Sequence, residues 1–295
     1  GSGCRAGGGA RPGRAGRGGR VVMRVVVRAG EDDTAAARWG AAEASALLDE
    51  LRPGGWGAPA GGDACPAELV YGEVSAQGLA GVLRWIEAAE GTPQPADRAG
   101  HHKSLLWPHG AGVFWDLGSG AGAAVVLAAL LRPFGFCGGV EVQPALHLAA
   151  EELGAAFTGR AAARLPFPAA RLEFRCGDCC APGGRPPTWA GADVVLVHAT
   201  AFGARLLGNV ARNAQHLRPG AWLVSVSKPL PGVGSGLFTL EGKEALPMEY
   251  GPAEVYFQRR SGRGAFDPEV LAFELEEAAS DEALLRELLA DWEDA

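Results

Sequence analysis

Short apolar runs alternate with segments of helical periodicity through the middle of the chain. Runs of this kind are typical of strands that are buried on both faces of a sheet. They lie at residues 113–117, 139–142, 172–176, 193–198 and 221–227. Helical patterns lie between them at residues 121–132, 144–163 and 204–217. This order predicts a doubly wound α/β sheet, and two further runs at 237–242 and 252–258 predict an antiparallel C-terminal hairpin that brings the sheet to seven strands.

The flanks of this region carry weaker patterns. A strand is expected over 21–27 and a helix over 32–51, and a helix over 75–90 has Ser75 as a suitable N-cap. Four parts are therefore predicted. They are a disordered Arg/Gly-rich arm (1–20), an N-terminal extension (21–67), a central domain (68–260) and an acidic C-terminal helix (261–295). Within the last part, the helical pattern itself covers residues 268–292.

Composition adds limits to this picture. The 295 residues have a net charge of −7, which argues against attraction of the whole molecule to nucleic acid. The charge is uneven, because residues 1–28 carry seven Arg and no acid, whereas 267–295 carry eleven acids. No apolar run approaches the roughly 20 residues of a membrane span, so no membrane partner is expected. Six Cys do not form a disulfide scaffold, and the cellular compartment stays open.

A glycine-rich turn follows the first central strand, in the segment Asp116-Leu-Gly118-Ser-Gly120-Ala-Gly122. Such a turn between a strand and a helix lets a ligand approach the backbone closely at a helix N-terminus. Glu141 ends the next strand, where an acid in a doubly wound fold binds a ribose diol. Asp178 follows the third strand. Together these positions predict a site for a cofactor that contains a nucleoside.

The glycines alone also satisfy a dinucleotide fingerprint, since Gly118-x-Gly120-x-x-Ala123 fits that pattern. Asp116 decides between the cofactors. An acid two residues before the first glycine would repel a pyrophosphate, but it suits the positively charged amino-acid end of S-adenosylmethionine. We therefore expect S-adenosylmethionine rather than a nicotinamide cofactor, and methyl transfer rather than oxidoreduction.

Further blocks narrow the resemblance. Residues 70–75 (VYGEVS) open a helix before the glycine turn, and Asp193–Gly203, Leu217–Gly220 and Val224–Leu230 follow it in order. These blocks resemble the disruptor-of-telomeric-silencing (DOT) family of non-SET histone-lysine methyltransferases over about residues 68–260. The resemblance implies a class I, Rossmann-like methyltransferase that acts in chromatin on a nucleosomal lysine.

The resemblance also implies roles for individual residues, as follows. The methionine end of the cofactor would be covered by a loop that contains Glu73 and Ser75 and is shaped by Tyr71. The floor of the cofactor site would be formed by Asp116, Gly118 and Gly120. Glu141 would bind the ribose, and the adenine would be flanked by Asp178 and Cys179. On the acceptor side, Phe202 would line the lysine channel, and Tyr250 with Tyr256 would close it.

The chain departs from the family at three positions. Val74 stands where the family has Thr, Cys179 where it has an aromatic residue, and His198 where it has Asn. His198 is a candidate base for an acceptor amine or hydroxyl, because its ordinary pKa is near neutrality; a hydrogen-bonded structural histidine is the other interpretation. Its presence leaves open a small molecule or a non-histone protein as acceptor, as well as a relative without catalysis.

Two further expectations concern metals and partners. Cys176-x-x-Cys179-Cys180 has no second CxxC or HxxxH to complete four ligands, so no metal site is predicted. A histone or nucleosome is the expected macromolecular partner, with nucleic acid contacted only through the Arg-rich arm. The protein is expected to be a monomer.

Overall fold

The computed structural model describes residues 39–52, 73–91, 110–181 and 185–262. Several sequence-based predictions lie outside these residues: the arm over 1–20, the strand over 21–27, Tyr71, and the helix over 268–292. The predicted division into four parts is therefore described only for its central domain and for one helix of the N-terminal extension. Among the described helices, none is both long and apolar enough to cross a membrane.

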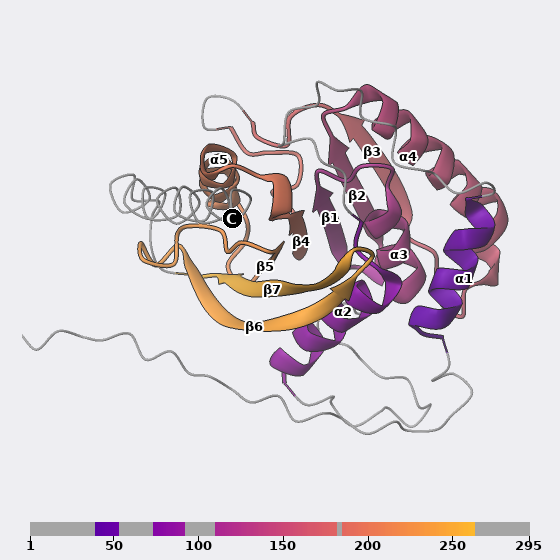
Figure 1. Cartoon of the computed structure of the whole chain (residues 1–295), viewed down its shortest axis with the longest axis horizontal. Helices are drawn as coiled ribbons and strands as arrows, with labels where there is room; N and C mark the ends of the chain where they lie inside the picture. Colours follow the sequence, from indigo (N-terminus) through magenta and orange to yellow (C-terminus); the bar gives the residue numbers. More distant parts are fainter. Residues whose placement is uncertain (1–38, 53–72, 92–109, 182–184, 263–295) are drawn as a thin grey trace, which may run out of the picture.

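Seven strands form one mixed sheet, as the apolar runs predicted (Figure 1). Their order across the sheet is β3-β2-β1-β4-β5-β7-β6. The first five are parallel, and β7 runs antiparallel to both β5 and β6. The strands are β1 (Val113–Leu117), β2 (Phe136–Glu141), β3 (Arg171–Cys176), β4 (Val194–His198), β5 (Trp222–Val226), β6 (Phe238–Met248) and β7 (Gly251–Arg260). This arrangement confirms the predicted fold class.

Helices cover both faces of the sheet (Figure 1). They are α1 (Ala41–Leu51), α2 (Ala76–Ala89), α3 (Ala123–Leu131), α4 (Pro144–Ala156) and α5 (Ala204–Ala214). The apolar faces of α1 to α4 join one core cluster with alternate side chains of the strands, and α5 joins a second cluster on the opposite face. Because successive strand residues point to opposite faces, this division fixes which side chains meet each helical layer.

Several elements differ in extent from their sequence patterns, since β2 begins at Phe136 instead of Gly139 and α5 ends at Ala214 instead of Leu217. The helix expected over 144–163 is α-helical only to Ala156 and continues as a π-helical turn (Phe157–Ala161) and a 3-10 turn (Ala162–Arg164). β6 extends to Met248 instead of ending near 242. Most side chains of β6 are exposed, so the part after residue 242 has no apolar run, and it forms through its backbone pairing with β7.

The C-terminal hairpin packs on α2 and brings its tip toward the start of that helix. The rings of Trp85 and Phe257 stack with their centroids 3.9 Å apart. Ser75 caps α2 by accepting the Gly78 amide at 3.0 Å, and its hydroxyl donates to the Pro247 carbonyl at 2.7 Å. The segment before α2 is therefore held against the hairpin at the carboxyl edge of the sheet, next to the glycine turn.

Candidate cofactor and acceptor site

The glycine turn runs from the end of β1 into α3. Gly118, Gly120 and Gly122 have φ values of +79°, +52° and +85°, a region that L side chains rarely adopt. The amides of Gly118 and Ser119 donate to the Val140 carbonyl of β2 at 2.9 and 3.0 Å. The turn is thereby held on the sheet edge, and α3 begins immediately after it at Ala123.

A neighbouring glycine in β2 permits this close approach. A Cβ on Gly139 would lie 2.6 Å from the Ser119 hydroxyl oxygen, so any larger residue would displace the turn. Gly118 is similarly confined, because a Cβ there would lie 3.2 Å from Cζ of Phe202. At both positions the absence of a side chain leaves room for its neighbour, which is Ser119 at Gly139 and Phe202 at Gly118.

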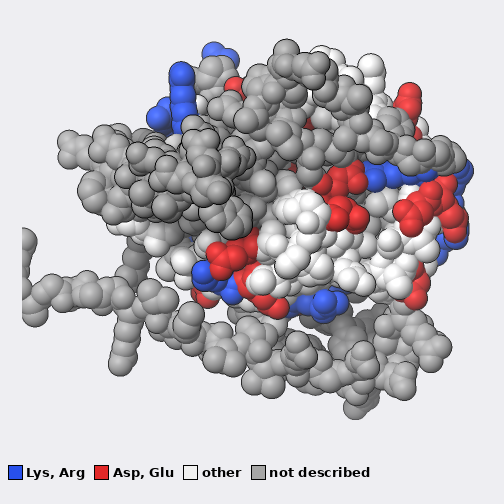
Figure 2. Space-filling view, in the orientation of Figure 1, with Lys and Arg blue, Asp and Glu red and all other residues white. Residues whose placement is uncertain are grey.

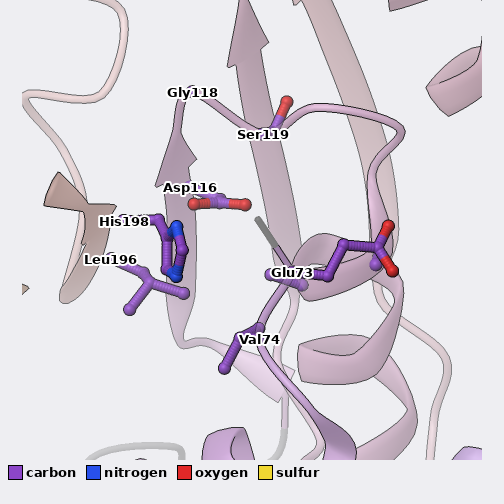
Figure 3. Close-up of a pocket in the computed structure, with 9 residues that line it drawn as sticks. Glu73, Val74, Asp116, Gly118, Ser119, Leu196 and His198 are labelled. Carbon is purple, nitrogen blue, oxygen red and sulfur yellow. The ribbon is translucent and has the colours of Figure 1, made fainter. Parts of the chain in front are cut away.

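Asp116 lies at the base of a pocket beside this turn (Figure 3). Its side chain is buried, and Oδ1 has no hydrogen-bond partner among the described residues. Burial, with a smaller contribution from the nearby charge of Glu141, raises the pKa of Asp116 from 3.8 to about 7. The pocket is lined by Glu73, Val74, Asp116, Gly118, Ser119, Ala123, Ala124, Leu196 and His198.

Glu141 joins the turn to the ends of β2 and β3. Its carboxylate is buried and accepts the Gly120 amide at 2.9 Å and the Gln143 amide at 2.8 Å. Its backbone carbonyl accepts the Gly177 amide at 2.8 Å. Asp178, one residue further, is exposed, and its Oδ1 accepts the Cys180 amide at 2.7 Å. Asp178 and Cys179 thus lie at the end of β3 and do not line the pocket around Asp116.

His198 ends β4 and stands beside Asp116 in the pocket (Figure 3). Its Nε2 lies 3.0 Å from the hydroxyl of Tyr250 at the hairpin tip. The Thr200 hydroxyl lies 3.4 Å from the same Tyr250 oxygen and 2.8 Å from the hydroxyl of Ser227. Burial lowers the pKa of His198, so its imidazole is neutral at pH 7. A neutral imidazole can accept a proton, which suits the predicted role as a base.

The other predicted acceptor-side residues are divided between two places. Phe202 lies against the glycine turn, as its approach to Gly118 shows. Tyr256 neighbours Val255 and Phe257, which pack in the cluster with α2, so its side chain lies on the opposite face of β7. There it donates to Glu254 at 2.7 Å. The predicted part of Tyr256 in the acceptor channel stays a prediction.

The segment before α2 contributes less to the pocket than the resemblance implies. Glu73 lines the pocket with its stem, while its carboxylate points away and forms two hydrogen bonds with Arg52 of α1, both 2.9 Å long (Figure 3). Ser75 uses its hydroxyl to cap α2 and to bind Pro247. Tyr71 lies outside the described residues. The cofactor-binding roles of these three residues therefore stay predictions.

Several pocket residues were not identified from the sequence. Ser119 is buried, and its hydroxyl has no hydrogen-bond partner among the described residues. It lies between two glycines that were identified, so the spacing alone could have found it. Leu196 lines the pocket as an apolar wall. Nothing in the sequence distinguishes Leu196 from the other buried residues of β4.

The donor groups of the pocket fit S-adenosylmethionine. That cofactor carries a sulfonium and an ammonium group, and a buried carboxylate without a partner is a matching feature for a cation. Burial raises the pKa of Asp116 and so disfavours its ionised form. A bound cation would favour that ionised form. A pyrophosphate would instead bring negative charge against Asp116 and Glu141. The electrostatics of the pocket therefore favour a cationic cofactor.

The chain is similar to known proteins over parts of its length. Residues 109–234 match the family model described as "Histone methylation protein DOT1". No curated protein matches the chain. Among solved structures, a candidate RNA methyltransferase from Pyrococcus horikoshii is 13% identical over 76% of this chain and 98% of its own, with a TM-score of 0.43. TrmN from Thermus thermophilus is 18% identical over 51% of this chain and 44% of its own, with a TM-score of 0.35.

The family match covers the glycine turn, all three strand-end acids, His198 and Phe202. Fold, pocket charge and family therefore lead to one assignment. Residues 109–234 are similar to the DOT1 histone methylation family, and the protein is an S-adenosylmethionine-dependent methyltransferase with a class I fold.

Proposed function

We propose that the protein is a protein-lysine N-methyltransferase that modifies a histone. The observation that carries the proposal is the match of residues 109–234 to a histone methylation family, with His198 and Asp116 of that segment in one pocket. The cofactor supplies a methyl group on a positively charged sulfur. Asp116, Gly118 and Gly120 would hold its methionine end, Glu141 would bind its ribose, and Asp178 with Cys179 would flank its adenine.

A lysine acceptor is positively charged in solution and must lose a proton before it can accept a methyl group. A lysine amine has a pKa near 10.4, so its deprotonation costs about 4–5 kcal/mol at pH 7. The low exposure of the pocket floor would lower this cost, since burial favours the neutral amine. His198 and Tyr250 would position the amine by hydrogen bonds, and His198 would accept the ammonium proton first. The neutral amine would then attack the methyl carbon, and the cofactor would leave as its neutral thioether.

Histone recognition also depends on the outer surface. Figure 2 shows acidic and basic side chains interspersed on the described part of one face, beside a pale area without charge. Binding to a nucleosome would add phosphate contacts, which dominate affinity for DNA. The seven Arg among residues 1–28 are the strongest basic run in the sequence. We propose that this run contacts DNA while the pocket receives the lysine.

A second candidate function is methylation of a small molecule. His198 favours it, because the family has Asn at this position and an imidazole suits deprotonation of a hydroxyl. Tyr250, which is 51% exposed, would then border an opening for a compact substrate. The two candidates share the cofactor pocket and differ only in what reaches His198.

The deciding experiment is transfer of a labelled methyl group to nucleosomes, free core histones and a small-molecule extract, after calorimetry with S-adenosylmethionine. Label on a histone lysine supports the proposal, and label only in the extract supports the second candidate. Asp116→Asn is the control that should lose binding and transfer together. His198→Asn restores the family residue, and it should keep lysine transfer only if the lysine proposal is correct.

A further inference from the structure

The ends of β3 and of the loop after it bring together three donor atoms outside the pocket around Asp116. The Sγ atoms of Cys179 and Cys180 lie 4.0 Å apart. A carboxylate oxygen of Asp178 and these two sulfurs all lie within 4.8 Å of one another. Cys176, which is exposed at the end of β3, does not belong to this group.

The spacing of these atoms suits one metal ion. Two thiolates that bind the same tetrahedral Zn²⁺ at about 2.3 Å have sulfurs about 3.8 Å apart. A disulfide between Cys179 and Cys180 would instead need the sulfurs to approach to about 2.05 Å across adjacent residues, a strained closure. The observed separation of 4.0 Å is therefore close to that of a shared ligand and far from that of a bond.

Neighbouring hydrogen bonds hold the three donor groups in place. Trp189 fixes the loop by donating to the Cys179 carbonyl at 2.7 Å. Asp178 uses Oδ1 to bind the Cys180 amide, which orients its carboxylate.

We propose that Asp178, Cys179 and Cys180 form a binding site for one soft divalent cation such as Zn²⁺, with the fourth position open. Two thiolates and one carboxylate are ligands that suit such an ion, and binding releases the remaining thiol protons to solvent. The sequence alone predicted no metal site, because it offers no second ligand pair at a regular spacing. The fold supplies a carboxylate as third ligand instead.

The site has a consequence that rests on the proposed function. Asp178 and Cys179 are the residues proposed to flank the adenine of the cofactor. A cation held by the same side chains would occupy them, so the cation and S-adenosylmethionine should weaken each other's binding by the same factor. The methyltransferase would then be inhibited by thiophilic metals at a site separate from Asp116 and His198.

The test uses the full chain carrying Cys4→Ser and Cys65→Ser, so that these two thiols do not contribute, with Cd²⁺ as a soft spectroscopic probe. Titration should give a cadmium–thiolate absorption band that saturates at one ion per chain. Cys180→Ser should reduce Cd²⁺ affinity by at least about 100-fold, since even loss of an outer-shell partner costs about 10–100-fold. Cys176→Ser is the matched control and should leave affinity unchanged.

Asp178→Asn provides a second variant that keeps both thiols, and it should weaken Cd²⁺ binding while the band remains. Thermal unfolding of each variant establishes that it is folded. A band that Cys180→Ser leaves intact, or that Cys176→Ser removes, would overturn the site. Calorimetry with S-adenosylmethionine, with and without Cd²⁺, tests the competition separately. Absence of cofactor binding in metal-free protein would contradict the proposed function but would leave the Cd²⁺ titration unaffected.

Discussion

Nε2 of His198 lies 3.0 Å from the hydroxyl of Tyr250, which joins the end of β4 to the tip of the β6–β7 hairpin. The two residues are 52 positions apart in the sequence. The interaction couples the predicted base to the turn between the antiparallel strands β6 and β7. It also gives the first prediction, because removal of either partner should affect turnover more than cofactor binding.

For the small-molecule candidate, His198→Ala should lower turnover by about 10²–10⁴-fold, the range expected for loss of a general base. Tyr250→Phe should lower it by about tenfold, because one hydrogen bond is lost. Calorimetry should find the affinity for S-adenosylmethionine within about twofold of wild type in both, since neither residue has a predicted role in cofactor binding. Tyr256→Phe should cost less than Tyr250→Phe; an equal loss would place Tyr256 in the channel and contradict the position of its side chain.

The pH dependence of turnover follows from the lowered pKa of His198. A base must be neutral to accept a proton, and burial keeps this imidazole neutral down to a pH below its ordinary value of 6.5. The histidine-dependent part of turnover should therefore fall in acidic solution with a midpoint below pH 6.5. Rates measured from pH 5 to 8 in wild type and His198→Asn test this. A midpoint above pH 6.5 in wild type would exclude His198 as the cause of the fall.

Asp116→Asn should stabilise the ligand-free protein while it removes cofactor binding. The folded-state pKa of Asp116 is about 7, above its unfolded value of 3.8, so its contribution to stability is present below pH 4 and lost as the pH rises through 7. The loss is at most about 4 kcal/mol, since each pKa unit corresponds to about 1.4 kcal/mol. Denaturant unfolding at pH 5 and pH 8 should show a smaller decrease in the free energy of unfolding for Asp116→Asn. An identical decrease in both proteins would rule out this burial effect.

Gly122→Ala should destabilise the protein by about 1–3 kcal/mol, the cost of a strained backbone conformation. Its φ is +85°, and a Cβ would lie 2.8 Å from Cε1 of Phe174 and 2.9 Å from Cβ of Ala150. Gly159→Ala is a suitable control, because a Cβ there would meet no atom within 4 Å. Thermal unfolding of both variants makes the comparison, and equal melting temperatures would argue against the close contact at Gly122.

Substitutions of Ser75 test whether this residue only caps α2 or also contacts the cofactor, as the resemblance implies. Ser75→Ala removes the N-cap of α2 and should cost about 1 kcal/mol of stability. Ser75→Thr keeps a hydroxyl that can cap the helix and should restore most of this loss. If Ser75 also contacts the cofactor, Ser75→Ala should weaken S-adenosylmethionine binding at a temperature where the variant is fully folded. Unchanged affinity under those conditions would leave only the capping role.

Local pattern alone determined much of this protein. β1 was predicted with its observed bounds, and the α2 cap was identified at Ser75, because buried strands and helix N-termini leave short-range signals. The glycine turn and Asp116 identified the cofactor end of the sheet for the same reason. The part of β6 after residue 242 had no such signal, since its mostly exposed side chains give no apolar run and its pairing with β7 is a backbone interaction.

Only the tertiary structure decided how the candidate residues combine. The sequence contains Glu73, Arg52, His198 and Tyr250, but their contacts join segments 21 and 52 residues apart. It contains Cys179 and Cys180 without revealing that their sulfurs and Asp178 converge. The contact of His198 with Tyr250, for example, depends on the end of β4 and the tip of the hairpin meeting at one edge of the sheet. A sequence pattern specifies which face of an element is buried, whereas long-range packing determines which side chains meet there.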